Sequence, residues 1–89
     1  MRAVITVIGK DTVGILSAVA NECAKVNVNI TDVTQSVLKD MFAMIMLVDI
    51  SNASVPFSEL SDILSKMGND RGLQVHVMNE EIFDAMHRI

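Results

Sequence analysis

The spacing of apolar residues changes near the start of the chain, and this change most limits how the chain can fold. Residues 3–8 are rich in Val and Ile, and the run is too short for a helix, so it predicts a buried strand that breaks at Gly9. From Gly14 the apolar residues recur at helical spacing, which predicts a helix over about 14–25. The first amides of a helix have no intrahelical acceptor and attract anions. We therefore expect a carboxylate or phosphate to dock at this turn.

The remaining chain alternates between strand and helix patterns. The predicted elements are strands over 30–38 and 42–51, a helix from about residue 57, a strand over 73–78 and a helix over 80–89. Gly68 either lies inside the middle helix, at a cost of about 1 kcal/mol, or ends it early. Gly72 is the better stop for that helix, because glycine is favoured just past a helix end.

This order predicts an α+β fold, the ferredoxin-like βαββαβ two-layer sandwich with a four-stranded antiparallel sheet and an extra C-terminal helix. Right-handed crossovers place both long helices on one face of the sheet. The third predicted strand is apolar on both sides, with Phe42, Met44, Met46, Val48 and Ile50 on one and Ala43, Ile45 and Leu47 on the other. The second side therefore needs cover. We expect residues 1–79 to form the domain and residues 80–89 a helix that packs on it or on a partner subunit.

Composition excludes several classes of partner. The chain has 89 residues, of which 51% are hydrophobic, so it forms one small domain whose core is marginal without a partner subunit. Seven basic residues against eleven acidic ones give a formal charge of −4, which argues against nucleic acid and anionic membranes. The chain has a single cysteine, no signal-peptide pattern and no apolar run of about 20 residues. The cytoplasm is the expected location.

Residues with catalytic or metal-binding chemistry are scattered. Cys23, His76 and His87 lie on different predicted elements without ligand spacing, so we expect no metal and no cofactor. Cys23 falls on the apolar stripe of the first helix and is interpreted as a core residue. The two histidines are interpreted as solvent or interface residues. No nucleophile elbow and no phosphate-binding glycine motif occurs, so we predict no catalytic residues and no enzyme.

The turn before the first helix is the candidate site. Asp11 and Thr12 lie in it, Gly14 allows close backbone approach, and Asn29 and Asp32 flank the start of the second strand. Helix amides suit a carboxylate and side-chain oxygens suit an ammonium group, which together fit an α-amino acid. In this fold a neighbouring subunit can bring its second strand to the turn. A site closed by two subunits excludes water better than an open loop.

A purely structural explanation of the same residues is equally open. Gly9 and Gly14 are then turn glycines, Asp11 or Thr12 is the helix N-cap, and Asn29 caps the end of the first helix. The residues alone do not choose between the two explanations.

At these residues the chain resembles an ACT domain, a small regulatory module that binds amino acids in many metabolic enzymes and transcriptional regulators. The resemblance covers Arg2 to Met78 and rests on ITVIGKDTVGILSAVANECAKVNVNITDV and FAMIMLVDI. It is strongest to stand-alone single-ACT proteins, and the chain is also similar to the ACT half of the glycine cleavage system transcriptional repressor. The ending EIFDAMHRI resembles that of the stand-alone proteins.

The resemblance implies a set of binding residues. Asp11, Gly14 and Asn29 match the family's binding positions, and Ile15 offers a backbone amide. The family commonly has Arg and Pro where this chain has Thr12 and Val13.

Two functions follow from this resemblance. The first is a non-catalytic regulatory homodimer that binds a small amino acid, with the start of the second strand shared across the interface. The second is a structural dimerisation or protein-docking module without a small-molecule ligand.

Overall fold

The computed structural model describes residues 1–10 and 13–86. The elements are β1 (Arg2–Lys10), α1 (Ile15–Lys25), β2 (Asn29–Leu38), β3 (Met41–Asp49), α2 (Phe57–Asp70), β4 (Gln74–Asn79) and α3 (Glu80–Met86). The predicted βαββαβ order with a further helix is confirmed. The predicted site residues Asp11 and Thr12 lie outside the described residues, as do His87 and Ile89 at the end of the last predicted helix.

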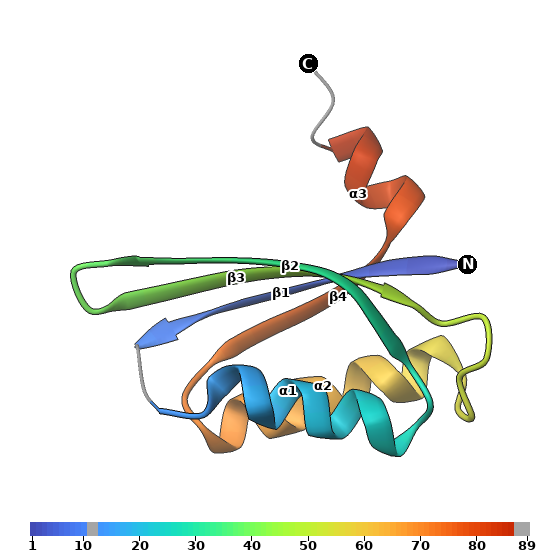
Figure 1. Ribbon diagram of the computed structural model, residues 1–89, viewed down its shortest axis with the longest axis horizontal. Coiled ribbons are helices and arrows are strands. Elements are labelled where there is room, and N and C mark those ends of the chain that lie inside the picture. The colour runs from blue at the N-terminus through green and yellow to red at the C-terminus, as the bar shows by residue number, and fades with distance from the viewer. Residues whose placement is uncertain (11–12, 87–89) are drawn as a thin grey trace.

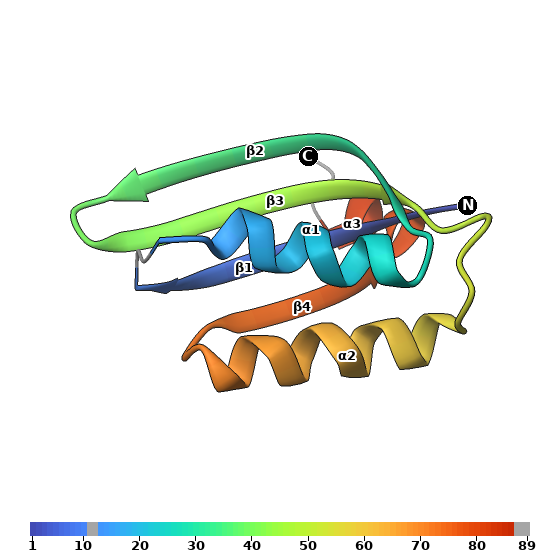
Figure 2. The ribbon, with the colours of Figure 1, turned by 60° about the horizontal axis from the view of Figure 1, so that its bottom comes forward.

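The molecule has two main layers and a projecting helix. The sheet has the order β2-β3-β1-β4, and every neighbouring pair is antiparallel. Helices α1 and α2 cover one face of it, while α3 rises from the other face where β4 ends (Figure 1). Seen from below, α2 runs beside β4 and α1 crosses in front of the central strands (Figure 2). The ferredoxin-like prediction is therefore confirmed.

The face of the sheet away from α1 and α2 is called the open face below. The strand register places on it Val4, Thr6, Ile8 and Lys10 of β1, Asp32, Thr34 and Ser36 of β2, Met41, Ala43, Ile45 and Leu47 of β3, and Gln74, His76 and Met78 of β4.

The core fills the space between the sheet and the two long helices. Alternate residues of β3 from Phe42 to Val48 point into it, as their spacing predicts. Cys23 is fully buried there, and burial, with a smaller contribution from the nearby Glu22 carboxylate, raises the pKa of its thiol to about 11. On the open face Ile45 of the same strand is 46% exposed, so the described residues of the chain do not provide the second cover that the sequence calls for.

Both long helices end in the same way. After α1 the chain turns at Asn27, whose φ is 61°, and the Val28 amide donates to the Cys23 carbonyl at 2.9 Å. After α2 it turns at Gly72, whose φ is 71°, and the Leu73 amide donates to the Gly68 carbonyl at 2.7 Å. Gly72 is thus the stop that the sequence predicts. The residue that turns the chain after α1 is Asn27 rather than Asn29, so the cap assigned to Asn29 is wrong.

Two of the differences between predicted and observed strand ends have an identified physical cause. β1 continues through Gly9 to Lys10, because Gly9 is a packing position: a Cβ built on it would lie 2.5 Å from Cδ2 of Leu73. The predicted break at Gly9 is therefore wrong. β3 ends at Asp49 and not at residue 51, because an Asp49 carboxylate oxygen accepts the Ser51 amide at 2.9 Å and turns the backbone.

Candidate functional site

We call the N-terminus of α1 the α1 mouth, formed by Val13, Gly14 and Ile15. Gly14 precedes the helix with φ 86° and ψ 14°. The first intrahelical bond runs from the Ala18 amide to the Gly14 carbonyl at 2.9 Å, so the amides of residues 15–17 have no acceptor within the helix. Among residues 1–10 and 13–86, no side chain caps this end. The mouth therefore presents free amide donors and the positive end of the helix dipole.

Gly14 is needed for its backbone conformation. A Cβ built on it would meet none of the described residues within 4 Å. Its positive φ is a conformation that side chains with a Cβ rarely adopt. The structure thus gives Gly14 a role in left-handed turn geometry, and the close backbone approach of a ligand at Gly14 stays a prediction. Val13 beside it is 99% exposed and Ile15 is only 2% exposed, which anchors the first turn in the core.

A basic residue ends the strand that leads toward the mouth. Lys10 borders a hollow of about 260 Å³ together with Gly9, Asp40 and Met41 of the β2–β3 hairpin. The strand register places its side chain on the open face, so Lys10 belongs to this hollow and not to the α1 mouth. At the mouth itself the free amides and the helix dipole favour an anionic group.

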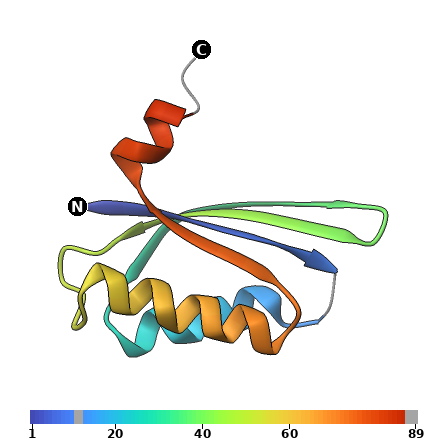
Figure 3. The same cartoon turned by 180° about the vertical axis from the view of Figure 1, so that it is seen from behind.

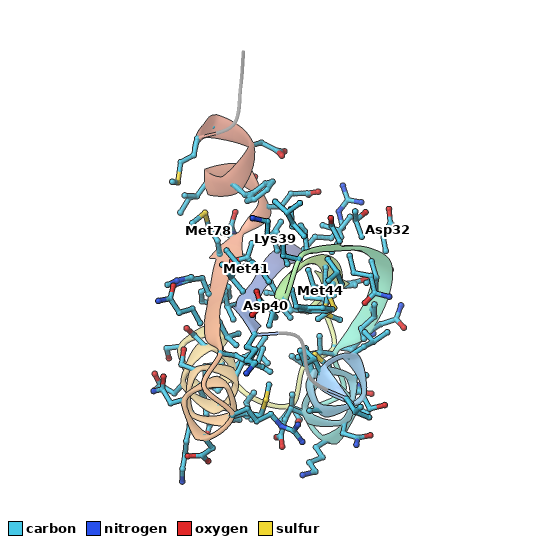
Figure 4. All side chains as sticks on the ribbon, turned by 90° about the vertical axis from the view of Figure 1, so that its left-hand side faces the viewer. Asp32, Lys39, Asp40, Met41, Met44 and Met78 are labelled. Atoms are coloured by element: carbon cyan, nitrogen blue, oxygen red, sulfur yellow. The ribbon has the colours of Figure 1, made fainter. Side chains whose placement is uncertain are left out.

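The other predicted site residues lie elsewhere in the same chain. Asn29 begins β2 and pairs with Asp49. This pair lies at the end of the sheet opposite to the mouth. The eleven residues of α1 separate Gly14 from Asn29 by about 16 Å. Asp32 pairs with Leu47 beyond a bulge in β2, and Figure 4 shows it at the outer edge of the sheet, away from the helices. One chain alone therefore does not bring these residues to the mouth.

Asn29 lies instead in a polar hollow of about 440 Å³, called the asparagine hollow below. Its lining residues are Ala24, Asn27, Val28, Asn29, Asp49 and Asn52. The Asn27 side-chain amide donates to the Asn52 carbonyl at 2.8 Å, which holds the two loops together. The hydroxyl and amide of Ser51 lower the pKa of Asp49, so this carboxylate is charged at neutral pH.

The sequence reasoning missed three residues of this hollow. Asn27, Asp49 and Asn52 come from three separate segments, and the antiparallel pairing of β2 with β3 brings them together. The sequence offered one sign of this hollow, the two asparagines Asn27 and Asn29 that follow the first helix. Their proximity to Asn52 depends on the strand register, which the sequence alone does not reveal.

Two features are absent from the residues that the structure describes: a metal-binding cluster and a membrane-spanning helix. Within residues 1–10 and 13–86 there is no group of three or more His, Cys, Asp or Glu residues placed to hold a metal ion. None of the described helices has the length and apolar character needed to cross a bilayer.

Comparison with known proteins agrees with the fold. Residues 2–78 match the family described as the ACT domain. A UPF0237 protein of Listeria monocytogenes is 46% identical over 89 residues, covering 100% of both chains, and one of Methanocaldococcus jannaschii is 49% identical over 88 residues, covering 99% of this chain and 98% of that one. The solved structure of an ACT domain protein from Streptococcus pneumoniae superposes with a TM-score of 0.81 at 33% identity, covering 98% of each chain. This chain belongs to the ACT domain family.

Proposed function

We propose that this ACT domain is a non-catalytic regulatory module of the cytoplasm, which binds a small amino acid between two copies of the chain. The observation that carries the proposal is the α1 mouth, where the first helix amides have no acceptor within the helix and, among the described residues, no side-chain cap. Membership of a family of regulatory modules supports it. The ligand's carboxylate binds the amides of the mouth, and its ammonium group binds side-chain oxygens.

A second copy supplies those oxygens. β2 is an edge strand of ten residues with one charged side chain, so its outer backbone groups are available for pairing. β2 begins at Asn29 and ends at Leu38, and Leu38 lies at the same end of the sheet as the mouth. When two β2 strands pair antiparallel about a two-fold axis, the partner's Asn29 comes to the mouth end of this chain.

Exposed apolar residues beside the edge suit this pairing. Leu16 of α1 is 37% exposed and Val37 of β2 is 52% exposed, and both lie near the mouth end. Burying apolar area there adds to the hydrogen bonds of the paired strands. The paired arrangement also excludes water from the space between the mouth and the partner's asparagine hollow, which strengthens charged hydrogen bonds.

The hydrogen bonds available to the ligand can supply the binding free energy expected for a small metabolite. Millimolar to micromolar affinity corresponds to about −4 to −8 kcal/mol. Hydrogen bonds to charged groups contribute about 1.5 to 3 kcal/mol each, so three or four of them reach this range. The charged Asp49 in the asparagine hollow provides an acceptor for the ammonium group in addition to Asn29. Asp11, Thr12 and Asp32 complete the set of proposed ligand-binding residues, with Gly14 and Ile15.

The test is a thermal-shift and calorimetric screen of the free amino acids. A ligand at about 100 times its Kd stabilises the folded protein by about 2.7 kcal/mol. We expect one or a few small amino acids to raise the melting temperature, and Asp11→Ala and Asn29→Ala to abolish the shift. Asn21→Ala, an exposed substitution of the same type on α1, retains it. A folded protein that responds to none of the amino acids at millimolar concentration contradicts the proposal.

One observation favours the second function, a docking module without a ligand. Apolar side chains remain exposed on the open face and on α3, including Ile45 at 46% and Met86 at 64%. In that case the same screen gives no shift, while association persists.

A further inference from the structure

Helix α3 carries apolar surface that the described residues of its own chain do not cover. It has seven residues, none of the described ones is fully buried, and Ile82 and Met86 are 55% and 64% exposed. Isolated helices shorter than about 12 residues are marginal in water, so a helix of this length depends on packing. α3 lies against β1 and β4, and beneath it Val4 of the open face is only 4% exposed. Its outer side has no such cover from the described residues.

The direction of α3 is fixed by two sets of contacts. The Arg2 guanidinium binds the Glu80 carboxylate through two atom pairs, Nε to Oε1 and Nη2 to Oε2, each at 3.0 Å. The Asn79 side-chain oxygen accepts the Glu81 amide at 2.8 Å, which caps the helix start. β4 passes into α3 without a linker, so the helix stands up from the sheet and makes a corner with the open face (Figures 1 and 3).

The opposite end of the open face is apolar and exposed. We call it the hairpin end, formed by Ile8, Met41 and Ile45, which are 43%, 52% and 46% exposed. Exposure thus rises along β1 from Val4, which α3 covers, to Ile8, which nothing described covers. Figure 4 shows Met41 at the β2–β3 hairpin, while Met78 lies close to α3.

The two ends of the open face also carry opposite charge. α3 contributes Glu80, Glu81 and Asp84, whereas the hairpin end is bordered by Lys10, Lys39 and Asp40. Within the described residues the helix is therefore net negative and the hairpin end is net positive. A surface with complementary charge at its two ends fits a copy of itself turned end for end.

We propose that the open face and α3 bind the same surface of a second copy of this chain. The two-fold axis reverses the strand direction, so that α3 of each copy packs against the hairpin end of the other. This contact lies on a different surface from the β2 edge and goes beyond the proposed function. If both contacts form, four chains assemble as two edge-paired dimers stacked face to face.

The area is adequate for a stable contact. The four strands hold 34 residues, which at about 4.8 Å spacing and about 3.3 Å per residue give a sheet face of about 540 Å². The side of α3 that carries Ile82 and Met86 extends this toward the about 800 Å² per partner of a standard interface. The sheet alone would fall short of that area.

The experiment compares masses in solution, measured by light scattering and sedimentation equilibrium at equal protein concentrations. Ile45→Glu and Met86→Glu each place a charge in the proposed contact. We expect each to halve the number of chains per particle. Phe57→Glu, a partly exposed apolar residue on the opposite layer, is the matched control and leaves the mass unchanged. Circular dichroism confirms that each variant is folded.

The proposal is overturned if Ile45→Glu and Met86→Glu both stay folded and keep the wild-type mass, or if the wild type is monomeric at about 100 µM. Its failure is distinguishable from failure of the proposed function. The amino-acid screen run on Ile45→Glu tests the α1 mouth after the open-face contact has been removed. If Ile45→Glu responds to an amino acid but keeps the wild-type mass, the open-face contact is contradicted and the proposed ligand is not. If its mass is halved and it responds to no amino acid, the proposed ligand is contradicted and the open-face contact is not.

Discussion

Gly68 gives the sharpest test of the packing between α2 and the sheet. It is buried in the last turns of the helix, and a Cβ built on it would lie 2.5 Å from Cγ2 of Val75 and 3.1 Å from the Leu73 carbonyl oxygen. Val75 is β-branched and 6% exposed, so its methyl group has little room to move. Overpacking of this kind costs about 1 to 3 kcal/mol, whereas alanine gains about 1 kcal/mol in helix propensity over glycine. We expect Gly68→Ala to destabilise the protein by about 1 kcal/mol.

A double-mutant cycle separates the two contributions. Val75→Ala removes the methyl group that blocks the new Cβ and costs about 2 kcal/mol by itself. In that background Gly68→Ala keeps its propensity gain and fills part of the vacated space, so it becomes stabilising by about 0.5 to 1 kcal/mol. The coupling energy between the two sites is then about 1.5 to 2 kcal/mol.

Urea unfolding at a fixed protein concentration measures all four variants, with unchanged m-values as the check that the folded state is comparable. The reasoning is refuted if Gly68→Ala alone stabilises the protein by about 1 kcal/mol and adds to Val75→Ala without coupling. That result means that α2 and β4 are not in close contact at this point.

Three further predictions use the same unfolding assay. Gly14→Ala costs about 1 to 2 kcal/mol from its positive φ, and Gly14→Asn recovers most of this because asparagine tolerates that conformation; equal losses in both variants would contradict the assignment. The pKa of Asp49 is lower in the folded chain than its ordinary value of 3.8. The contribution of Asp49 to stability is therefore present above pH 4 and is lost as the pH falls through the folded-state pKa. The variant Asp49→Asn lacks this part of the acid dependence. The pKa of Cys23 is raised to about 11, so its contribution is present below pH 9 and is lost as the pH rises toward 11; Cys23→Ala has a flatter profile over that range.

The layering of the fold could be predicted from the sequence because it follows local periods. Alternate residues of β3 from Phe42 to Val48 face the helices, and the residues between them face the open side. Gly72 could be identified as a helix stop because glycine readily takes the left-handed conformation after a helix. Each of these positions is decided by its near neighbours in the chain.

One error arose because a distant contact decides the conformation, and the other because the exact end of a helix does. Gly9 looks like a turn glycine, yet it lies inside β1 because Leu73, far along the chain, packs against it. Asn27 and Asn29 are chemically equal candidates for the left-handed position after α1. The bond from the Val28 amide to the Cys23 carbonyl selects Asn27, and this selection depends on where the helix ends rather than on residue type.

In the candidate site, too, the local features could be predicted from the sequence and the relative placement of distant segments could not. The sequence identifies Gly14 and Asn29 as candidate site positions near the two ends of the first helix, but α1 runs back along the sheet and places them at opposite ends of one chain. An antiparallel pair of β2 strands turns this separation into proximity between chains. Ligand binding and association are then linked, since a ligand that contacts both subunits strengthens their association by the same factor by which association strengthens ligand binding. In the proposed arrangement the chain would report the concentration of an amino acid through its state of assembly, without any change in the fold of each copy.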